Sequence, residues 1–303
     1  MPNPNKSTID PVTRVEGHGR ITVQLDEDGR VDQARFHVVE FRGFERFIQG
    51  HPYWEAPLLV QRLCGICPVS HHLAAAKAVD QIYGASPQDL TPTATKIRRL
   101  LHFAQIFQSH ALHFFYLASP DLLFGVDAPV AKRSVVAVAL EHEDLARRGI
   151  LMRQFGQELI RALAGKKIHG ITAIPGGVHK TLHAHERDRF LVKHDAPSVD
   201  TMIEWAQDVV GFIKDYHDRH YAWLDRFASY PSGHLGLVTA NGALEFYDGN
   251  LRAIDSSGAV TLNDVAGDDY LKYFGEGVEK WSYMKFPYLR HYGRTKGWNR
   301  VGP

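Results

Sequence analysis

The longest patterned stretch of this sequence runs from Pro92 to Ala118. Apolar side chains recur there at the three- and four-residue spacing that lines one face of an α-helix. They are Ile97, Leu100, Leu101, Ala104, Phe107, Ala111, Phe114, Phe115 and Ala118. Thr91 is a suitable N-cap, with Pro92 at the first helical position, and Ser119-Pro120-Asp121 is expected to end the helix. So long a helix with one apolar face needs helical partners, which predicts a bundle.

Two further stretches predict helices, over roughly residues 134–164 and 202–229. Gly149 and Gly156 lie inside the first stretch. Because glycine weakens a helix, its presence there indicates places where another helix approaches closely. The second stretch opens on Thr201-Met202-Ile203-Glu204, a sequence typical of a capping box.

Short β segments are predicted on both sides of these helices. Residues 19–41 alternate apolar and polar side chains around Asp28-Gly29, a dipeptide typical of hairpin turns. From about residue 235 to 263, dipeptides ending in glycine separate short apolar segments, which predicts a small antiparallel β insertion. Residues 1–7 are expected to be a loose tail. The aromatic run from Trp281 to Tyr288 is interpreted as core or interface rather than a site.

The predicted fold class is therefore mainly α with β additions (α+β), built on a helical bundle core. Since no repeat or flexible linker interrupts the sequence, residues 1–303 are expected to form a single domain. With 44% hydrophobic and 23% charged residues, the composition is that of an ordinary soluble protein, and a net charge of +1 does not indicate a nucleic-acid partner. No apolar run reaches the roughly 18 residues of a membrane helix, and no secretory signal is visible.

Both cysteines of the chain lie in one motif, Cys64-Gly65-Ile66-Cys67, which Pro68 follows. Gly65 allows a tight turn that brings the two thiols to one side. The residues from His72 to Tyr83 predict a helix that begins near Pro68, so Cys67 is expected at its N-terminus. The helix dipole favours a thiolate there, the form that binds a metal or attacks an electrophile.

The motif by itself leaves three interpretations open: a structural disulfide, a thioredoxin-like redox pair, or half of a metal site. Two cysteines in 303 residues give no disulfide framework and indicate a reducing compartment. The strand and βαβ order that a thioredoxin fold needs is not found around the motif. His110 and His113 lie one turn apart on the long helix and are interpreted as partly buried, hydrogen-bonded histidines.

Four patches of the sequence, taken together, resemble the large, catalytic subunit of a nickel–iron hydrogenase. They are Asp10–His18, Phe41–Glu45, Arg62–Cys67 with His71, and Gly165–His169 leading to Pro175-Gly176-Gly177. The motifs Arg-x-Glu-Gly-His and Arg-x-Cys-Gly-x-Cys-x-x-x-His are specific in combination. The cytoplasmic, bidirectional NAD-linked branch is the more similar one, on the runs Val39–Glu45, Phe47–Pro52 and Trp281–Leu289. The resemblance extends from Ile9 to Pro303 and is weakest across the β insertion.

This resemblance implies an active site in which a nickel is joined to an iron that carries carbon monoxide and cyanide. Cys64 is implied to be a terminal nickel ligand and Cys67 to bridge nickel and iron, and soft thiolates suit both metals. His71 matches the histidine that hydrogen-bonds the bridging sulfur, a contact that tunes a ligand's basicity.

Three acidic residues acquire implied roles in the same way. Glu16 matches the carboxylate that accepts a proton from a terminal cysteine when H2 is split. Glu45 matches a ligand of a structural Mg2+, a cation that prefers oxygen donors. Asp121 lies where the family has an acid near the metal pocket.

The resemblance also implies partners, because this chain has no further cysteines to hold electron-transfer clusters. Electrons from the substrate H2 are expected to leave through iron–sulfur clusters of a hydrogenase small subunit. FMN and NAD are expected on diaphorase subunits of a cytoplasmic complex.

The sequence departs from the family pattern at its C-terminal end. It lacks the C-terminal Asp-Pro-Cys-x-x-Cys, a histidine for magnesium and an arginine near the cyanides. We therefore expect an N-terminal portion of such a subunit, truncated at the C-terminus and inactive alone. The alternative is a non-catalytic relative, such as the fold-sharing subunit of respiratory complex I or a degenerate hydrogenase-like subunit. The presence of Cys64, Cys67 and Glu16 argues against that alternative.

Overall fold

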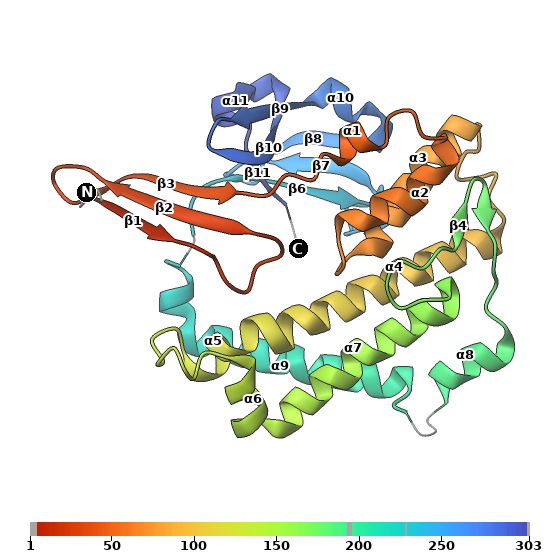
Figure 1. Ribbon diagram of the computed structural model, residues 1–303, viewed down its shortest axis with the longest axis horizontal. Helices are drawn as coiled ribbons and strands as arrows, with labels where there is room; N and C mark the ends of the chain where they lie inside the picture. The colour runs from red at the N-terminus through yellow and green to blue at the C-terminus, as the bar shows by residue number, and fades with distance from the viewer. Residues whose placement is uncertain (1–4, 193–195, 228, 302–303) are drawn as a thin grey trace. The chain divides into compact units, whose positions relative to one another are not determined.

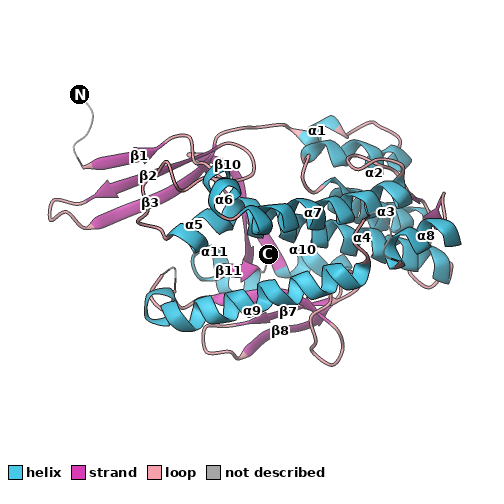
Figure 2. Cartoon of the chain, turned by 90° about the horizontal axis from the view of Figure 1, so that it is seen from below, coloured by secondary structure: helices cyan, strands magenta, loops and turns pink. Residues whose placement is uncertain are grey.

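The computed structural model describes residues 5–192, 196–227 and 229–301. The chain divides into two compact units, one of residues Gly43–Asp225 and one of Met1–Arg42 with Arg226–Pro303. Most helices belong to the first unit and most strands to the second, so the predicted α+β class is confirmed (Figure 2). The expectation of a single domain stays a prediction. None of the helices in the described ranges has the length and apolarity to span a membrane.

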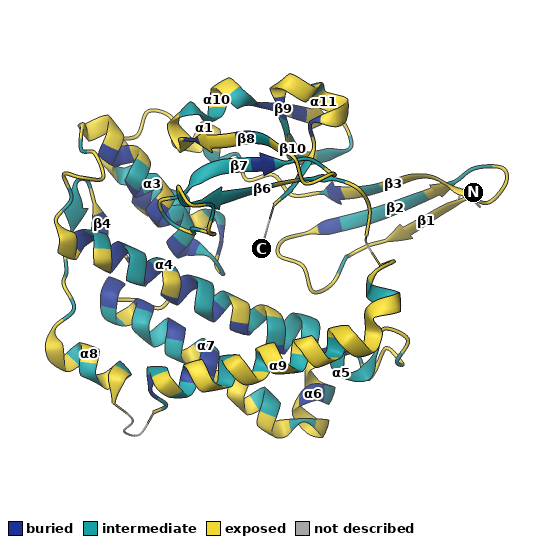
Figure 3. Cartoon of the chain, turned by 180° about the vertical axis from the view of Figure 1, so that it is seen from behind, coloured by how far each residue is buried: buried dark blue, intermediate teal, exposed yellow. Residues whose placement is uncertain are grey.

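The helical unit contains nine α-helices and one short hairpin among its described residues (Figure 1). The helices are α1 (Phe44–Phe47), α2 (Ala56–Leu59), α3 (Pro68–Tyr83), α4 (Pro92–Leu112), α5 (Ser119–Phe124), α6 (Val135–Glu141), α7 (Glu143–Ala164), α8 (Ala184–Leu191) and α9 (Val199–Leu224). The hairpin pairs β4 (Ala173–Ile174) with β5 (Gly177–Val178). Buried residues recur along the facing sides of α3, α4 and α7 (Figure 3).

Helix α7 packs side by side with α4 and with the π-helical turn that follows it, His113–Ala118, through the two glycines singled out in the sequence. A Cβ added at Gly149 would lie 2.5 Å from the Cβ of Phe115. A Cβ added at Gly156 would lie 2.7 Å from the Cβ of Gln108 and 2.9 Å from the carbonyl oxygen of Ala104. All three distances are below van der Waals contact, so the expected close approach of a second helix is confirmed.

The first long helix has the predicted start but not the predicted end. Thr91 is its N-cap, with Oγ1 accepting the Ala94 N–H at 3.2 Å. Ser119-Pro120-Asp121 does not end it, because the chain continues through a π-helical turn, His113–Ala118, into α5. Pro120 lies in the first turn of α5, and the Ser119 hydroxyl beside it donates to the Phe115 carbonyl oxygen at 2.6 Å.

Two other helix predictions were wrong at their boundaries. The expected helix over 134–164 is two helices, because His142 leaves the helical conformation with φ −136° and ψ 55° between α6 and α7. Helix α9 begins at Val199 after Ser198 and ends at Leu224, so the capping box expected at Thr201 is not its start. A capping box instead starts α8, a helix not predicted from the sequence.

The described residues of the other unit form three sheets. Their strands are β1 (Lys6–Ile9), β2 (Gly19–Leu25), β3 (Val31–Val38), β6 (Gly233–Val238), β7 (Asn250–Ile254), β8 (Val260–Val265), β9 (Phe274–Glu279), β10 (Ser282–Leu289) and β11 (Asn299–Val301). The first sheet is antiparallel in the order β1-β2-β3, and β9 pairs with β10. The third has the order β11-β6-β7-β8, with β11 parallel to β6. The predicted hairpin and β insertion are confirmed.

One expectation about the N-terminal segment was wrong. Lys6 and Ser7 are not a loose tail, because they pair with β2 as the first residues of strand β1. The segment from Val12 to His18 is a loop, in which Arg14 has φ 57° and Gly17 has φ 75°. A left-handed residue interrupts strand geometry, so alternate residues of this segment do not share one face.

Gly156→Ala is expected to destabilise the helical unit even though alanine is the better helix former. The added methyl group would meet the Ala104 carbonyl and Gln108, and overpacking of this kind costs about 1–3 kcal/mol. Urea denaturation followed by circular dichroism measures the change. Gly211→Ala in α9 is the matched control, because a Cβ there meets nothing within 4 Å, and it should stabilise by up to about 1 kcal/mol. Equal effects of the two substitutions would contradict this account of the α4–α7 contact.

Candidate metal centre

The cysteine loop lies between a 3-10 turn, Val60–Leu63, and helix α3. Cys64 is buried, Cys67 is half-buried at the N-cap of α3, and the two are not joined in a disulfide. The Sγ of Cys64 accepts the backbone N–H groups of Ile66 at 3.3 Å and of Cys67 at 3.1 Å. N–H donors directed at a sulfur suit it to carry the negative charge of a thiolate ligand.

Polar side chains from other segments hold the carbonyl groups of this loop. Gln105 and Gln108 of α4 both donate from Nε2 to the Ile66 carbonyl oxygen, at 3.0 and 3.1 Å. His169, at the end of a patch noted in the sequence, places Nε2 3.3 Å from the Cys64 carbonyl oxygen. The loop is therefore fixed by side chains from segments about 40 and 105 residues away in the sequence.

His71 lies four residues after Cys67, one turn along α3, and so on the same helix face. The residue is half-buried, and burial lowers the pKa of its imidazole from the ordinary value of 6.5. At neutral pH the ring is therefore neutral, with one N–H to donate and one nitrogen to accept. Such a ring can donate a hydrogen bond to a thiolate without itself carrying a charge.

The neighbouring His72 is a structural residue that the sequence did not reveal. Its side chain is 1% exposed, and Nδ1 donates to the Pro57 carbonyl oxygen at 2.9 Å. Nε2 accepts the N–H groups of Thr172 at 3.3 Å and Ala173 at 3.0 Å. Burial is the main cause that lowers the pKa of His72, and the charge of Arg98 lowers it further. A neutral ring with its proton on Nδ1 fits all three contacts.

The other implied site residues lie on separate elements. Glu45 is exposed in the first turn of α1, and Asp121 in the first turn of α5 forms an ion pair with Arg133 at 3.0 Å. Glu16 is exposed in the loop between β1 and β2, in the other unit of the chain. Of the implied site residues, Cys64, Cys67 and His71 lie together at the start of α3, and the three acidic residues lie on other elements.

His110 and His113 are exposed rather than partly buried, which corrects the interpretation of their burial. His110 Nδ1 does form a hydrogen bond, to the Ile106 carbonyl oxygen of its own helix at 2.8 Å. Neither residue lies on the buried face of the bundle, so neither is a candidate ligand at the cysteine loop.

The donors of the cysteine loop fit part of a metal site. Within the described ranges, no group of three or more His, Cys, Asp or Glu side chains is placed to hold a metal ion. Cys64 and Cys67 supply two soft thiolate donors from one turn, a pairing that suits nickel or iron. The two cysteines fit half of the four-thiolate set that the sequence resemblance implies. The other two thiolates would have to come from outside this chain.

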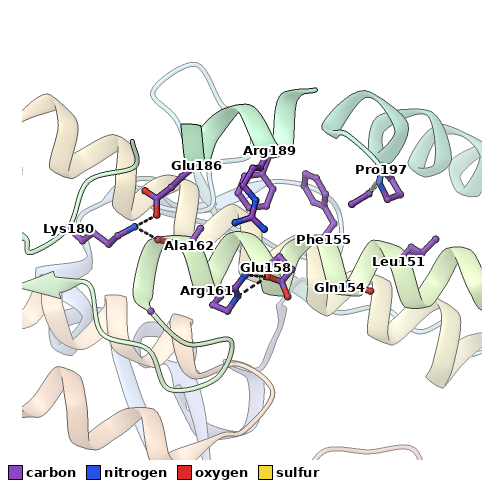
Figure 4. A pocket seen from close by; sticks show the side chains of 13 residues that line it. Leu151, Gln154, Phe155, Glu158, Arg161, Ala162, Lys180, Glu186, Arg189 and Pro197 are labelled. Carbon is purple, nitrogen blue, oxygen red and sulfur yellow. Dashed lines mark hydrogen bonds and ion pairs between the residues drawn. The ribbon is translucent and has the colours of Figure 1, made fainter. Parts of the chain in front are cut away.

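A cavity of about 730 Å³ lies elsewhere in the helical unit, between α7, α8 and residues 196–197 (Figure 4). Its charged side chains are Glu158, Arg161, Lys180, Glu186 and Arg189. Lys180 donates to the Ala162 carbonyl oxygen at 2.6 Å and to Glu186 at 2.7 Å, and the lysine contact lowers the pKa of Glu186 to about 2. The charged groups are thus largely paired with one another, and none of the implied site residues lines this cavity.

Comparisons with known proteins identify similar sequences along almost the whole chain. Residues 42–144 match the family model described as nickel-dependent hydrogenase, and residues 6–41 match one described as HoxL-like. The chain is 50% identical to the NAD-reducing hydrogenase HoxS subunit beta of Cupriavidus necator, over 98% of this chain and 62% of that protein. It is 39% identical to one subunit of the F420-non-reducing hydrogenase vhu of Methanococcus voltae, over 98% of this chain and 69% of that protein.

A solved structure, that of an NAD+-reducing NiFe-hydrogenase in the H2-reduced state, matches with a TM-score of 0.93 and 51% identity. The match covers 98% of this chain and 64% of the solved chain. The present chain therefore spans less than two thirds of the length of that structure and of the Cupriavidus necator protein.

The buried His72 predicts a pH-dependent stability. Because folding lowers its pKa, the unfolded chain binds a proton more readily, and stability is lost as pH falls below about 6.5. Above that pH the contribution is fully present. His72→Gln keeps a donor and an acceptor but cannot titrate, so its urea midpoint should fall less between pH 7 and pH 5. His71→Gln, at a half-buried position, should flatten the profile less than His72→Gln. Wild-type pH dependence in His72→Gln would contradict this assignment.

Proposed function

The chain belongs to the nickel-dependent hydrogenase family, and on this premise we propose that it forms the N-terminal portion of a nickel–iron hydrogenase catalytic subunit. The proposed reaction interconverts H2 with protons and electrons. The observation that carries the proposal is the pair of thiols, Cys64 and Cys67, at the start of α3 with His71 one turn further along. Two soft donors at the start of a helix, with a neutral imidazole one turn further along, are suited to holding and tuning such a centre.

Cys64 would be a terminal nickel ligand, and Cys67 would bridge nickel to an iron that carries carbon monoxide and cyanide. When bound, this centre supplies the place where H2 is split and its electrons are taken up. The two N–H groups that point at the Cys64 sulfur would stabilise its negative charge, and His71 would donate to the Cys67 sulfur. The other two thiolates would come from a C-terminal cysteine pair of the longer protein.

Glu16 would accept the proton that leaves a terminal cysteine. Heterolytic cleavage of H2 releases a proton that needs an acceptor, and an exposed carboxylate can pass it on to water. The support for Glu16 is its place in the motif Arg14-x-Glu16-Gly17-His18. Glu45 would be an oxygen ligand of a structural Mg2+. Asp121, paired with Arg133, would lie near the metal pocket.

Electrons would leave through iron–sulfur clusters of a small subunit, because both cysteines of this chain are assigned to the nickel–iron centre. Diaphorase subunits carrying FMN would then reduce NAD in a cytoplasmic complex. The name of the Cupriavidus necator relative, an NAD-reducing hydrogenase, supports NAD as the acceptor.

Nickel analysis together with H2-driven dye reduction, on the complex expressed from a full-length gene, tests the proposal. We expect nickel in the wild-type complex, and loss of both nickel and activity in Cys67→Ser, since a serine hydroxyl is a poor ligand for these soft metals. Wild-type complex from nickel-starved cells is the reference for zero activity. A wild-type complex without nickel, or a Cys67→Ser complex with full activity, would rule the proposal out.

Glu16→Gln should leave the nickel content intact and lower H2-driven dye reduction by about 10²–10⁴-fold, the usual contribution of a positioned proton acceptor. Glu16→Asp should lose less of this activity, because it keeps a carboxylate. Glu27→Gln, an exposed glutamate in the β2–β3 turn, is the matched control and should keep full activity. Full activity of Glu16→Gln would remove this residue from the proton path.

A further inference from the structure

Two carboxamide side chains of α4 converge on one backbone oxygen of the cysteine loop. Gln105 and Gln108 are each 3% exposed and lie three residues apart, on one face of the helix. Both donate to the carbonyl oxygen of Ile66, at 3.0 and 3.1 Å. A carbonyl oxygen has two lone pairs, so this pair of donors satisfies the group completely.

The peptide that carries this oxygen also carries the N–H of Cys67. A peptide group is planar and trans, so its N–H points away from its C=O in a fixed direction. That N–H donates to the Sγ of Cys64 at 3.1 Å. Holding the Ile66 oxygen on α4 therefore directs the Cys67 N–H at the Cys64 sulfur.

The contact that Gln108 makes with the loop leaves its side-chain oxygen buried without a hydrogen bond within the described ranges, which costs free energy. Its Oε1 is buried and has no hydrogen-bond partner among the described residues. The opposite amide orientation would place Oε1 against the Ile66 oxygen, so the network fixes Nε2 as the atom that faces the loop. A buried, unpartnered acceptor is destabilising, which indicates that the donor, rather than the whole amide, is what this position requires.

We propose that Gln105 and Gln108 are positioning residues that preset the Cys64 sulfur as a metal ligand. They fix the peptide between Ile66 and Cys67, and that peptide directs its N–H at the sulfur before any metal binds. The assignment rests on the proposed metal-binding function of Cys64 and Cys67. The orientation of the peptide can be tested separately, in an experiment without metal.

The first test is a titration of the reduced 303-residue chain with Ni2+, followed by thiolate-to-nickel charge-transfer absorption. The double variant Gln105→Leu/Gln108→Leu should bind Ni2+ about 10–100-fold more weakly, the usual effect of removing groups that orient metal ligands. Each single variant keeps one donor and should lose less affinity for Ni2+. Gln154→Leu, on the exposed face of α7, is the matched control and should bind like wild type.

The second test needs no metal. Oxidation by glutathione disulfide converts the two thiols to one Cys64–Cys67 disulfide and releases two molecules of reduced glutathione. An N–H directed at the Cys64 sulfur favours the reduced pair. The double variant should therefore shift this equilibrium about tenfold towards the disulfide, which is about 30 mV in reduction potential. A residue that only filled space would leave the potential unchanged.

Urea midpoints measured in parallel separate orientation from folding. Gln108→Leu removes the unpartnered oxygen together with the donor, so it should fold with a wild-type midpoint and still shift the disulfide equilibrium. If the double variant does not fold, this single variant tests whether the glutamines orient the peptide between Ile66 and Cys67. Equilibrium constants for nickel and disulfide within twofold of wild type in folded variants would overturn the proposal. A wild-type chain that binds no Ni2+ would count against metal binding, and the disulfide equilibrium would still decide the role of the glutamines.

Discussion

A buried ion pair between Asp80 of α3 and Arg98 of α4 organises the helical unit around the cysteine loop. Arg98 donates to the two Asp80 carboxylate oxygens at 2.5 and 3.2 Å, and also to the carbonyl oxygens of Ile174 and Gly177. Asp80 accepts the Gly176 N–H at 2.8 Å. This one ion pair thus connects helices α3 and α4 with each other and with the β4–β5 hairpin. Loss of one partner would leave the other charge buried and unpaired, which typically costs about 3–5 kcal/mol.

The geometry of the loop follows from this arrangement. The hairpin continues from Thr172 and Ala173, whose N–H groups hold His72 on α3. Helix α4 carries Gln105 and Gln108 to the Ile66 carbonyl oxygen. The cysteine loop is therefore positioned from both sides by elements that the ion pair holds together.

The local part of this site could be predicted from the sequence, whereas the contacts that orient it could not. Pro68 and Gly84 mark the ends of α3, so Cys67 was correctly expected at a helix N-terminus. The break at His142 was missed because the apolar repeat continues through it. Gln105 and Gln108 were missed because a glutamine inside a helix pattern carries no signal of a partner some 40 residues earlier. Such contacts are set by tertiary packing, which periodicity does not encode.

The central claim is that the sulfur atoms of Cys64 and Cys67 bind nickel in the complete protein. X-ray absorption at the nickel edge of the full-length complex measures this most directly, because it counts the sulfur atoms around the metal. The account predicts a sulfur-dominated coordination shell in the wild type, and one sulfur fewer in a Cys64→Ser complex that retains nickel. A nickel shell of nitrogen and oxygen donors, or an unchanged sulfur count in Cys64→Ser, would contradict it.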